Sequence, residues 1–220
     1  MILSNKNNFI GLLIGQLVLI FTMPVLHYIS EDTGKLILHS AIIGMILLTI
    51  IGNEKDSAWY KLIITLTVLE IIILVIALFL NVFALTYIAI SLSLFFLFTS
   101  IVVAFKSVFF STNITLNQLV GASCIYLLLG IVWAILYSNL YYLSPDSFSG
   151  LSDINNKLHF PEFMYYSYVT LTTLGFGDIT PITPVAKTLS FMQAIVGQLY
   201  LTIMVAGLVG KAINSSKNPT

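Results

Sequence analysis

The chemically distinctive residues of this chain lie together in one short segment, Thr170–Asp178, which reads Thr-Leu-Thr-Thr-Leu-Gly-Phe-Gly-Asp. Two glycines spaced by one residue, an acid and the nearby Pro181 prevent a helix from continuing through it. The segment nevertheless lies between two long apolar runs, which places it at membrane depth. Non-helical backbone at that depth is tolerated only inside protein or along a water-filled path. The pattern therefore indicates a permeation pathway rather than a site of bond cleavage.

The residues just before this segment predict a helix that enters the membrane without crossing it. Pro161 suits the first position of a helix, and the dipole of the helix favours Glu162 in the first turn. A helix over 161–172 would be about 18 Å long, which is half a bilayer. Its carboxyl end would place partial negative charge where a cation could wait.

The composition is that of a polytopic membrane protein. Of 220 residues, 58% are hydrophobic and 8% are charged, against about 25% charged in a typical soluble domain. The mean hydropathy is +1.01. A soluble enzyme could not bury this much apolar surface, and nine lysines without any arginine form no patch for nucleic acid. The single Cys124 excludes a disulfide framework within the chain.

The apolar runs predict an all-α membrane protein with six spans. The run 62–105 has 44 residues, about 66 Å as one helix and twice the hydrocarbon thickness, so we expect a turn near Asn81. The first run lacks an Ala-x-Ala cleavage pattern and is expected to stay in the protein. The expected spans are 9–28, 36–51, 60–80, 84–105, 116–140 and 185–210.

The lysines predict the orientation in the membrane. With both termini in the cytoplasm, six lysines lie inside and three outside, as the positive-inside rule favours. The outer face would then carry six acids and three lysines, a net charge of −3 per chain that concentrates cations. We expect an integral protein of the plasma membrane.

The segment Thr170–Asp178 resembles the filter signature of the potassium channel family, Thr-x-x-Thr-Val-Gly-Tyr-Gly-Asp. The resemblance covers residues 116–211 and implies passive K⁺ flow through a homotetramer in the lipid bilayer, without catalysis and without a cofactor other than the permeant ion. It divides the chain into a four-helix transmembrane domain, 1–106, and a pore domain, 107–220, with an outer helix over 116–140, a pore helix over 161–172, a filter over 173–178 and an inner helix over 185–210.

The resemblance also assigns roles to the filter residues. A K⁺ ion sheds its hydration shell to pass, so the pore supplies replacement oxygens. Carried over, the ion-binding filter residues are Thr173, with its carbonyl and its hydroxyl, and Leu174, Gly175, Phe176 and Gly177. Carbonyls that point the same way need positive φ at alternate positions, which Gly175 and Gly177 adopt without penalty.

Two departures from the signature concern the support of the filter. Leu174 replaces Val, and Phe176 replaces Tyr, so the hydroxyl behind the filter is lost at that position. Tyr165 and Tyr166 stand where many members of the family carry Trp. The resemblance pairs Asp178 with a side chain of the pore helix, for which Tyr165 is the candidate. The expected supporting residues are Thr170, Thr172, Asp178, Tyr165 and Tyr166.

The inner helix carries a second set of candidates. Gly197 lies where the family has a gating hinge, although glycine is also a common packing residue in membrane helices. Leu201, Val205 and Val209 follow at intervals of four and would line the cavity on one face, or contact lipid or other helices. An apolar constriction there could gate by dewetting.

Three other classes fit the motif less well. A non-selective cation channel would be expected to carry an acid in place of the aromatic Phe176. A Gly-x-Gly-Asp intramembrane aspartyl protease needs a second aspartate on a neighbouring span, and the other aspartates all fall in loops. A transporter predicts a broken helix in each half, and the first half has none. The scattered His27, His39 and His159 do not predict a metal site.

The remaining question is what opens the pore. In the voltage-gated branch of the family, basic residues recur along the fourth helix. The expected fourth span of this chain, 84–105, contains no basic residue, and Lys106 follows at its end. We therefore expect no steep voltage gating. Glu70 lies in the third span without any base in 62–105, and we expect it to be neutral or hydrogen-bonded to a hydroxyl such as Ser91, Ser93 or Thr99. The gating stimulus and a separate regulatory subunit stay open.

Overall fold

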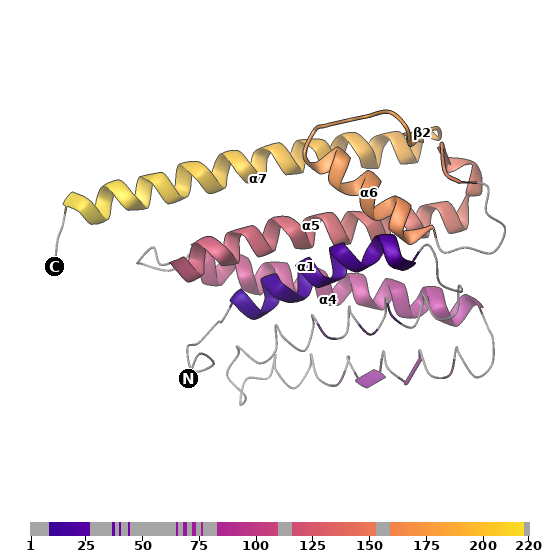
Figure 1. Cartoon of the computed structure of the whole chain (residues 1–220), viewed down its shortest axis with the longest axis horizontal. Coiled ribbons are helices and arrows are strands. Elements are labelled where there is room, and N and C mark those ends of the chain that lie inside the picture. Colours follow the sequence, from indigo (N-terminus) through magenta and orange to yellow (C-terminus); the bar gives the residue numbers. More distant parts are fainter. Residues whose placement is uncertain are drawn as a thin grey trace.

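The computed structural model is helical (Figure 1), and it describes residues 9–26, 37, 40, 44, 65, 68–69, 72–73, 76, 83–109, 116–152 and 159–217. Its helices are α1 (Phe9–Leu26), α4 (Phe83–Phe109), α5 (Leu116–Leu143), α6 (Phe160–Leu171) and α7 (Pro184–Lys217). A 3₁₀ turn, η1 (Pro145–Ser147), precedes the strand β1 (Phe148–Ser149), which pairs with β2 (Thr180–Pro181).

Two helices in the described part of the chain are long and apolar enough to cross a membrane: Leu116–Leu143 and Pro184–Gly207. Helix α5 runs three residues beyond its expected end at 140, and α7 continues past 210 to Lys217. Helix α5 ends where Ser144 and Pro145 follow, whereas the polar residues after 210 do not end α7. Most residues of the expected spans over 36–51 and 60–80 lie outside the described residues. Glu70 also lies outside them.

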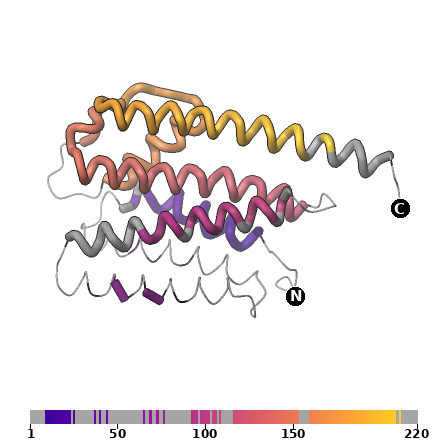
Figure 2. The backbone as a smooth tube through the Cα atoms, turned by 180° about the vertical axis from the view of Figure 1, so that it is seen from behind, coloured from indigo at the N-terminus to yellow at the C-terminus, as the bar shows by residue number. Residues whose placement is uncertain are grey.

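Helix α5 is the centre of the fold and contacts α1, α4, α6 and α7 (Figure 2). Its small and aliphatic residues form the core with α1 and α4, where Leu12, Leu19, Leu97, Ile125 and Leu128 are all buried. Helix α5 therefore packs against every other helix of the described part of the chain. Helices α6 and α7 are thus built on a helix that α1 and α4 also contact.

A second, aromatic core lies at the end of α5 where α6 begins. Tyr137 and Phe163 are fully buried, and Tyr166 and Phe148 are nearly so. Phe148 contacts Tyr137, Phe163 and Tyr166 edge-on, with ring centroids 5.2–5.5 Å apart. Edge-to-face contacts fix the relative angles of the rings. This cluster therefore sets the position of α6 against α5.

Candidate functional site

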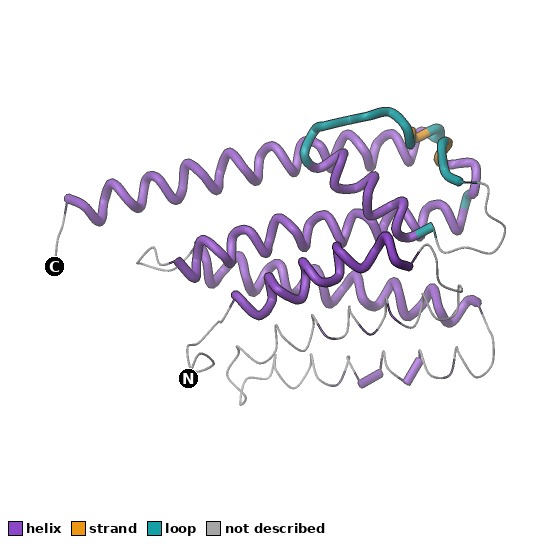
Figure 3. The backbone as a smooth tube through the Cα atoms, in the orientation of Figure 1, coloured by secondary structure: helices purple, strands orange, loops and turns teal. Residues whose placement is uncertain are grey.

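Helix α6 ends inside the bundle, and the chain then returns as extended backbone (Figure 3). It begins at Phe160 with Pro161 in its first turn and ends at Leu171 after 12 residues. Figure 1 shows α6 lying between α5 and α7, with the returning loop running to β2. This is the arrangement that the short helix and the Gly-x-Gly-Asp sequence predict.

The backbone after α6 alternates in handedness. Thr173, Gly175 and Gly177 have φ of 60°, 57° and 79°, respectively. The two glycines adopt this region readily, and an added Cβ would find no atom within 4 Å, so their requirement is conformational rather than steric. Thr173 is the one non-glycine residue with positive φ in the described part of the chain. A left-handed threonine is not predicted by the sequence, because its branched Cβ disfavours that region.

The start of this segment caps the end of α6. The Thr172 N–H donates to the Tyr168 carbonyl at 3.0 Å, and the Thr173 N–H donates to the Thr170 carbonyl, also at 3.0 Å. The N–H groups of Leu174 and Gly175 both donate to the Val169 carbonyl, at 2.9 and 3.3 Å. These bonds satisfy terminal carbonyls of the helix. Because each uses an N–H group of the segment, none consumes one of its carbonyl oxygens.

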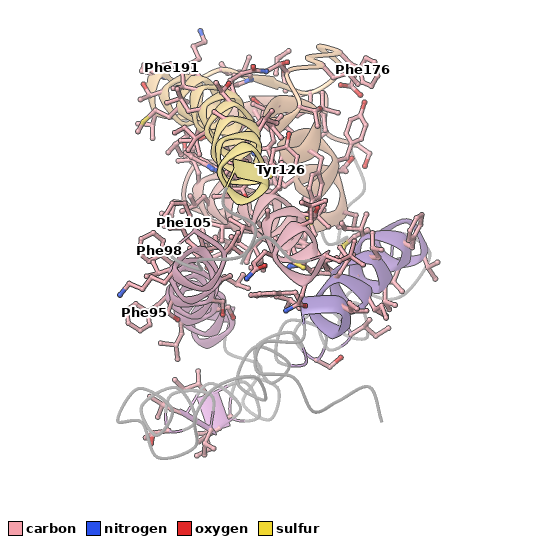
Figure 4. The ribbon with its side chains drawn as sticks, turned by 90° about the vertical axis from the view of Figure 1, so that its left-hand side faces the viewer. Phe95, Phe98, Phe105, Tyr126, Phe176 and Phe191 are labelled. Atoms are coloured by element: carbon pink, nitrogen blue, oxygen red, sulfur yellow. The ribbon has the colours of Figure 1, made fainter. Side chains whose placement is uncertain are left out.

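The side chains of the segment point away from the chain that carries them. Leu174 is 57% exposed and Phe176 is 65% exposed, and Figure 4 shows Phe176 at the edge of the molecule. Phe176 therefore makes little contact within its own chain. Thr172 is exposed as well, but its hydroxyl donates to the Tyr168 carbonyl at 2.7 Å. Thr170 is half-buried near the end of α6.

Asp178 is held at the end of the segment by the expected partner. The Tyr165 hydroxyl donates to Asp178 Oδ2 at 2.6 Å, and the Ile179 N–H donates to Oδ1 at 3.0 Å. The hydrogen bond from Tyr165 is the main cause that holds the pKa of Asp178 below its usual value. Tyr166 points instead to α7, where its hydroxyl lies 2.6 Å from Ser190 Oγ. The two neighbouring tyrosines thus fasten two different elements.

The loop after α5 clamps the outer end of the segment. Residues Phe148 and Ser149 pair with Pro181 and Thr180, and the Ile182 N–H donates to the Ser147 carbonyl at 2.8 Å. Gly150 has a φ of 86°, and a Cβ there would overlap the Asp178 carbonyl oxygen. No residue of this loop is among the sequence-predicted site residues. A glycine within a polar loop is a weak signal, because only the structure shows what approaches it.

A buried polar network joins helices α5, α6 and α7. The Tyr137 hydroxyl of α5 donates to Gln193 Oε1 of α7 at 2.6 Å. Gln193 Nε2 donates to the Ser167 carbonyl at 2.9 Å and to Ser167 Oγ at 2.7 Å, and that hydroxyl donates to the Gly130 carbonyl at 2.7 Å. These residues also escape prediction from the sequence. The available signal was a glutamine inside an apolar run, which marks a polar contact without identifying the partner.

The inner-helix candidates lie on the long helix α7. Gly197 is buried where α7 meets the end of α6, and a Cβ there would overlap the Leu171 carbonyl oxygen. The helix is continuous through this position. Leu201 is half-buried and Val205 is exposed in the single chain, while the side chain of Val209 lies outside the described residues. Gly197 thus has a packing role, and the hinge that the resemblance implies stays a prediction.

A contact between a histidine and a glutamate lies at the start of α6. His159 Nδ1 is 2.7 Å from Glu162 Oε2, and the Ser152 N–H and hydroxyl donate to Oε1 at 2.9 and 2.7 Å. Burial raises the pKa of Glu162, but the hydrogen bonds with His159 and Ser152 outweigh it, so the pKa lies below its usual value. Among the described residues, no three His, Cys, Asp or Glu side chains gather as metal ligands.

Comparisons with known proteins match the part of the chain that contains this site. Residues 121–214 match the model of a family described as "Ion channel". Two-pore potassium channel 2 of Arabidopsis thaliana is 32% identical over 104 residues, which are 46% of this chain and 20% of that protein. Two pore potassium channel c of Oryza sativa subsp. japonica is 38% identical over 53 residues, which are 24% of this chain and 12% of that protein.

A further relative shows the same partial coverage. Two-pore potassium channel 3 of Arabidopsis thaliana is 31% identical over 91 residues, or 41% of this chain and 18% of that protein. The chain therefore spans a fifth or less of the length of these three relatives. No solved structure matches the chain.

Proposed function

We propose that this chain is a potassium channel subunit that conducts K⁺ passively across a membrane, because residues 121–214 match an ion-channel family and the chain is similar over 104 residues to a two-pore potassium channel. One observation carries the proposal. A helix too short to span a membrane leads into backbone with positive φ at Thr173, Gly175 and Gly177. Alternation of this kind directs successive carbonyls toward one side. Four such segments around an axis would form stacked rings of oxygens.

These rings would replace the hydration shell of K⁺ one layer at a time. The carbonyls of Thr173, Leu174, Gly175 and Phe176 and the hydroxyl of Thr173 are the proposed K⁺ ligands, and Gly177 completes the segment. Capping of α6 through N–H groups supports this assignment, because the carbonyls stay available for ions. Asp178, held by Tyr165, would add negative charge at the outer mouth. No step forms or breaks a covalent bond.

We propose a homotetramer as the conducting form. This sequence carries one copy of the filter motif, and a four-sided filter needs four copies. The exposed side chains of Leu174 and Phe176 support this, since neighbouring subunits would cover them. Six spans, with both termini in the cytoplasm and the protein in the plasma membrane, complete the proposed topology.

The reversal potential of purified protein in liposomes tests the proposal directly. When external K⁺ is exchanged for Na⁺, the reversal potential should shift toward the K⁺ equilibrium potential. Equal permeability to both ions would identify a non-selective cation channel instead. Full flux from a purified dimer would contradict the tetramer.

We further propose that opening depends little on voltage. Each elementary charge that crosses the field supplies about 2.3 kcal/mol per 100 mV, and steep gating needs three or four per subunit. The sequence of α4 offers Lys106, in its last turn, as its single base. Single-channel recording between about −100 and +100 mV should give an open probability that changes only shallowly. A steep sigmoidal rise would overturn this part of the proposal.

A further inference from the structure

One polar side chain of α7 reaches the filter. Gln198 Nε2 donates to Thr173 Oγ1 at 3.3 Å. The surrounding sequence, Ile195-Val196-Gly197-Gln198-Leu199-Tyr200-Leu201, is otherwise almost entirely apolar. Gln198 therefore stands out as the amide on this turn of α7.

Close packing at the preceding residue makes the contact feasible. Gly197 has no side chain, which lets α7 approach the Leu171 carbonyl at the end of α6. Thr173 follows that end by two residues. A bulkier residue at 197 would push α7 outward and take Gln198 out of reach of Thr173. The helix thus presents a glycine to α6 and the next residue to the filter.

Thr173 is a residue whose conformation needs support. Its φ of 60° places a β-branched side chain in a sparsely populated region. The neighbouring Thr172 turns its hydroxyl back to carbonyls of α6, at Tyr168 and Val169. Of the two adjacent threonines, Thr173 is the one whose hydroxyl faces α7. The amide of Gln198 is in place to hold that hydroxyl in one orientation.

We propose that Gln198 is a positioning residue that holds the Thr173 hydroxyl at the inner end of the filter and thereby raises selectivity for K⁺ over Na⁺. The inference rests on the proposed function. By donating to one lone pair, the amide tethers the hydroxyl oxygen to α7 and leaves its other lone pair for an ion. A tethered ring of four hydroxyls cannot contract around the smaller Na⁺. Without the tether, the oxygens could move inward and bind both ions.

The test compares reversal potentials of purified variants in liposomes. Gln198→Leu removes the donor and keeps much of the volume, and Gln198→Asn keeps the amide on a side chain too short to reach. Each should lower the K⁺/Na⁺ permeability ratio about three- to tenfold, the range that corresponds to one net hydrogen bond. Thr202→Val is the matched control, since this exposed hydroxyl one turn along α7 donates only to the Gln198 carbonyl, at 2.8 Å. The control should keep the wild-type ratio.

A double-mutant cycle separates positioning from a general effect on the helix. If Gln198 acts through the Thr173 hydroxyl, Gln198→Leu should retain its effect beside Thr173→Ser and lose it beside Thr173→Val. If Thr173→Val does not conduct, the permeability ratio is replaced by a binding measurement. That measurement is the K⁺ concentration that gives half-maximal protection of the tetramer against thermal denaturation. Wild-type ratios from Gln198→Leu and Gln198→Asn would overturn the inference, as would additive effects in the cycle. A wild-type channel that does not select K⁺ would instead overturn the proposed function.

Discussion

The two halves of the bundle are held together by different kinds of contact. Between α5, α6 and α7, directed polar bonds cross from helix to helix, as at Tyr137, Gln193 and Ser167. Between α1, α4 and α5 the core is mainly apolar, and the Phe9 N–H donates to Asn117 Oδ1 at 3.2 Å while Cys124 Sγ donates to the Phe9 carbonyl at 3.4 Å. The buried Gln16 of α1 makes one bond to the Cys124 carbonyl, at 3.2 Å, while its Oε1 has no partner.

This difference matches what each half has to do. Hydrogen bonds are directional and fix the relative position of the groups that they join, whereas hydrophobic contacts have no preferred direction. Under the proposed function, a ring of carbonyl ligands would need a defined geometry, which the directed bonds between α5, α6 and α7 would supply. Helices α1 and α4 would need only to pack on α5. The half formed by α5, α6 and α7 should therefore respond to small changes that the half formed by α1, α4 and α5 absorbs.

The largest expected effect is that of Gly177→Ala. Alanine resists the φ of 79°, so the filter carbonyls should turn away from their common direction and K⁺ flux in liposomes should be abolished. Gly121→Ala is the counterpart in the other half, where the new Cβ would meet the Phe9 ring and a Val108 methyl group at 2.8 Å. These atoms belong to side chains and not to the backbone of the segment, so this variant should conduct. Loss of flux in both variants would remove the distinction between the halves.

Gly150→Ala should be the next most damaging change. The residue is left-handed, and its Cβ would overlap a backbone oxygen of Asp178, which cannot move without displacing the end of the filter. We expect strongly reduced K⁺ flux from a variant that still forms tetramers by size-exclusion chromatography. Ser149→Ala, which removes only the exposed contact to the Thr180 hydroxyl at 2.7 Å, is the control. Full flux from Gly150→Ala would mean that the outer loop does not clamp the filter.

Two glutamine substitutions compare the halves by stability. Gln193→Leu should leave the Tyr137 hydroxyl and the Ser167 carbonyl without this partner, at about 1–3 kcal/mol for each buried group. Gln16→Leu removes one bond together with an oxygen that has no partner, so the two effects should nearly cancel. The midpoint temperature of thermal unfolding, measured on the detergent-solubilised protein, should decrease clearly for Gln193→Leu alone. Equal decreases would refute the contrast.

The smallest expected effect is a pH shift in Tyr165→Phe. The hydrogen bond from Tyr165 lowers the pKa of Asp178. The wild-type carboxylate therefore keeps its negative charge, and the hydrogen bond keeps its contribution to stability, until the pH falls through that lowered pKa. Without the hydroxyl the pKa rises, and inhibition of K⁺ current by external acid should begin at higher pH. Tyr166→Phe, whose hydroxyl contacts Ser190 instead, should leave the acid response unchanged. A shift toward lower pH would contradict the assignment.

Local sequence rules predict the short helix and the break after it well. Pro161 and the two glycines act through their own backbone preferences, so their neighbours in space do not alter the prediction. The contact between Tyr165 and Asp178 was expected only through the family resemblance, and it is present. Helix ends were less predictable, since α7 continues seven residues beyond the end of its expected range at 210.

The remaining features depend on neighbours that are distant in the sequence. The left-handed Thr173 contradicts the preference of threonine and arises from the capping of α6 around it. Gln193 and Gln198 appear in the sequence as isolated polar residues in an apolar run. Their roles follow from the elements that α7 meets, at Ser167 and Thr173, which no periodicity reveals.

The capping of α6 by the residues that follow it also constrains the length of that stretch. Four successive N–H groups, from Thr172 to Gly175, reach back to carbonyls of the last turns, while positive φ falls on every second residue. Inserting or deleting one residue here would direct each N–H group to the wrong carbonyl and force the opposite set of residues into the left-handed region. Exchanging Leu174 or Phe176 for another side chain disturbs neither pattern. The stretch should therefore diverge among homologous chains by substitution at constant spacing, with alignment gaps falling outside it.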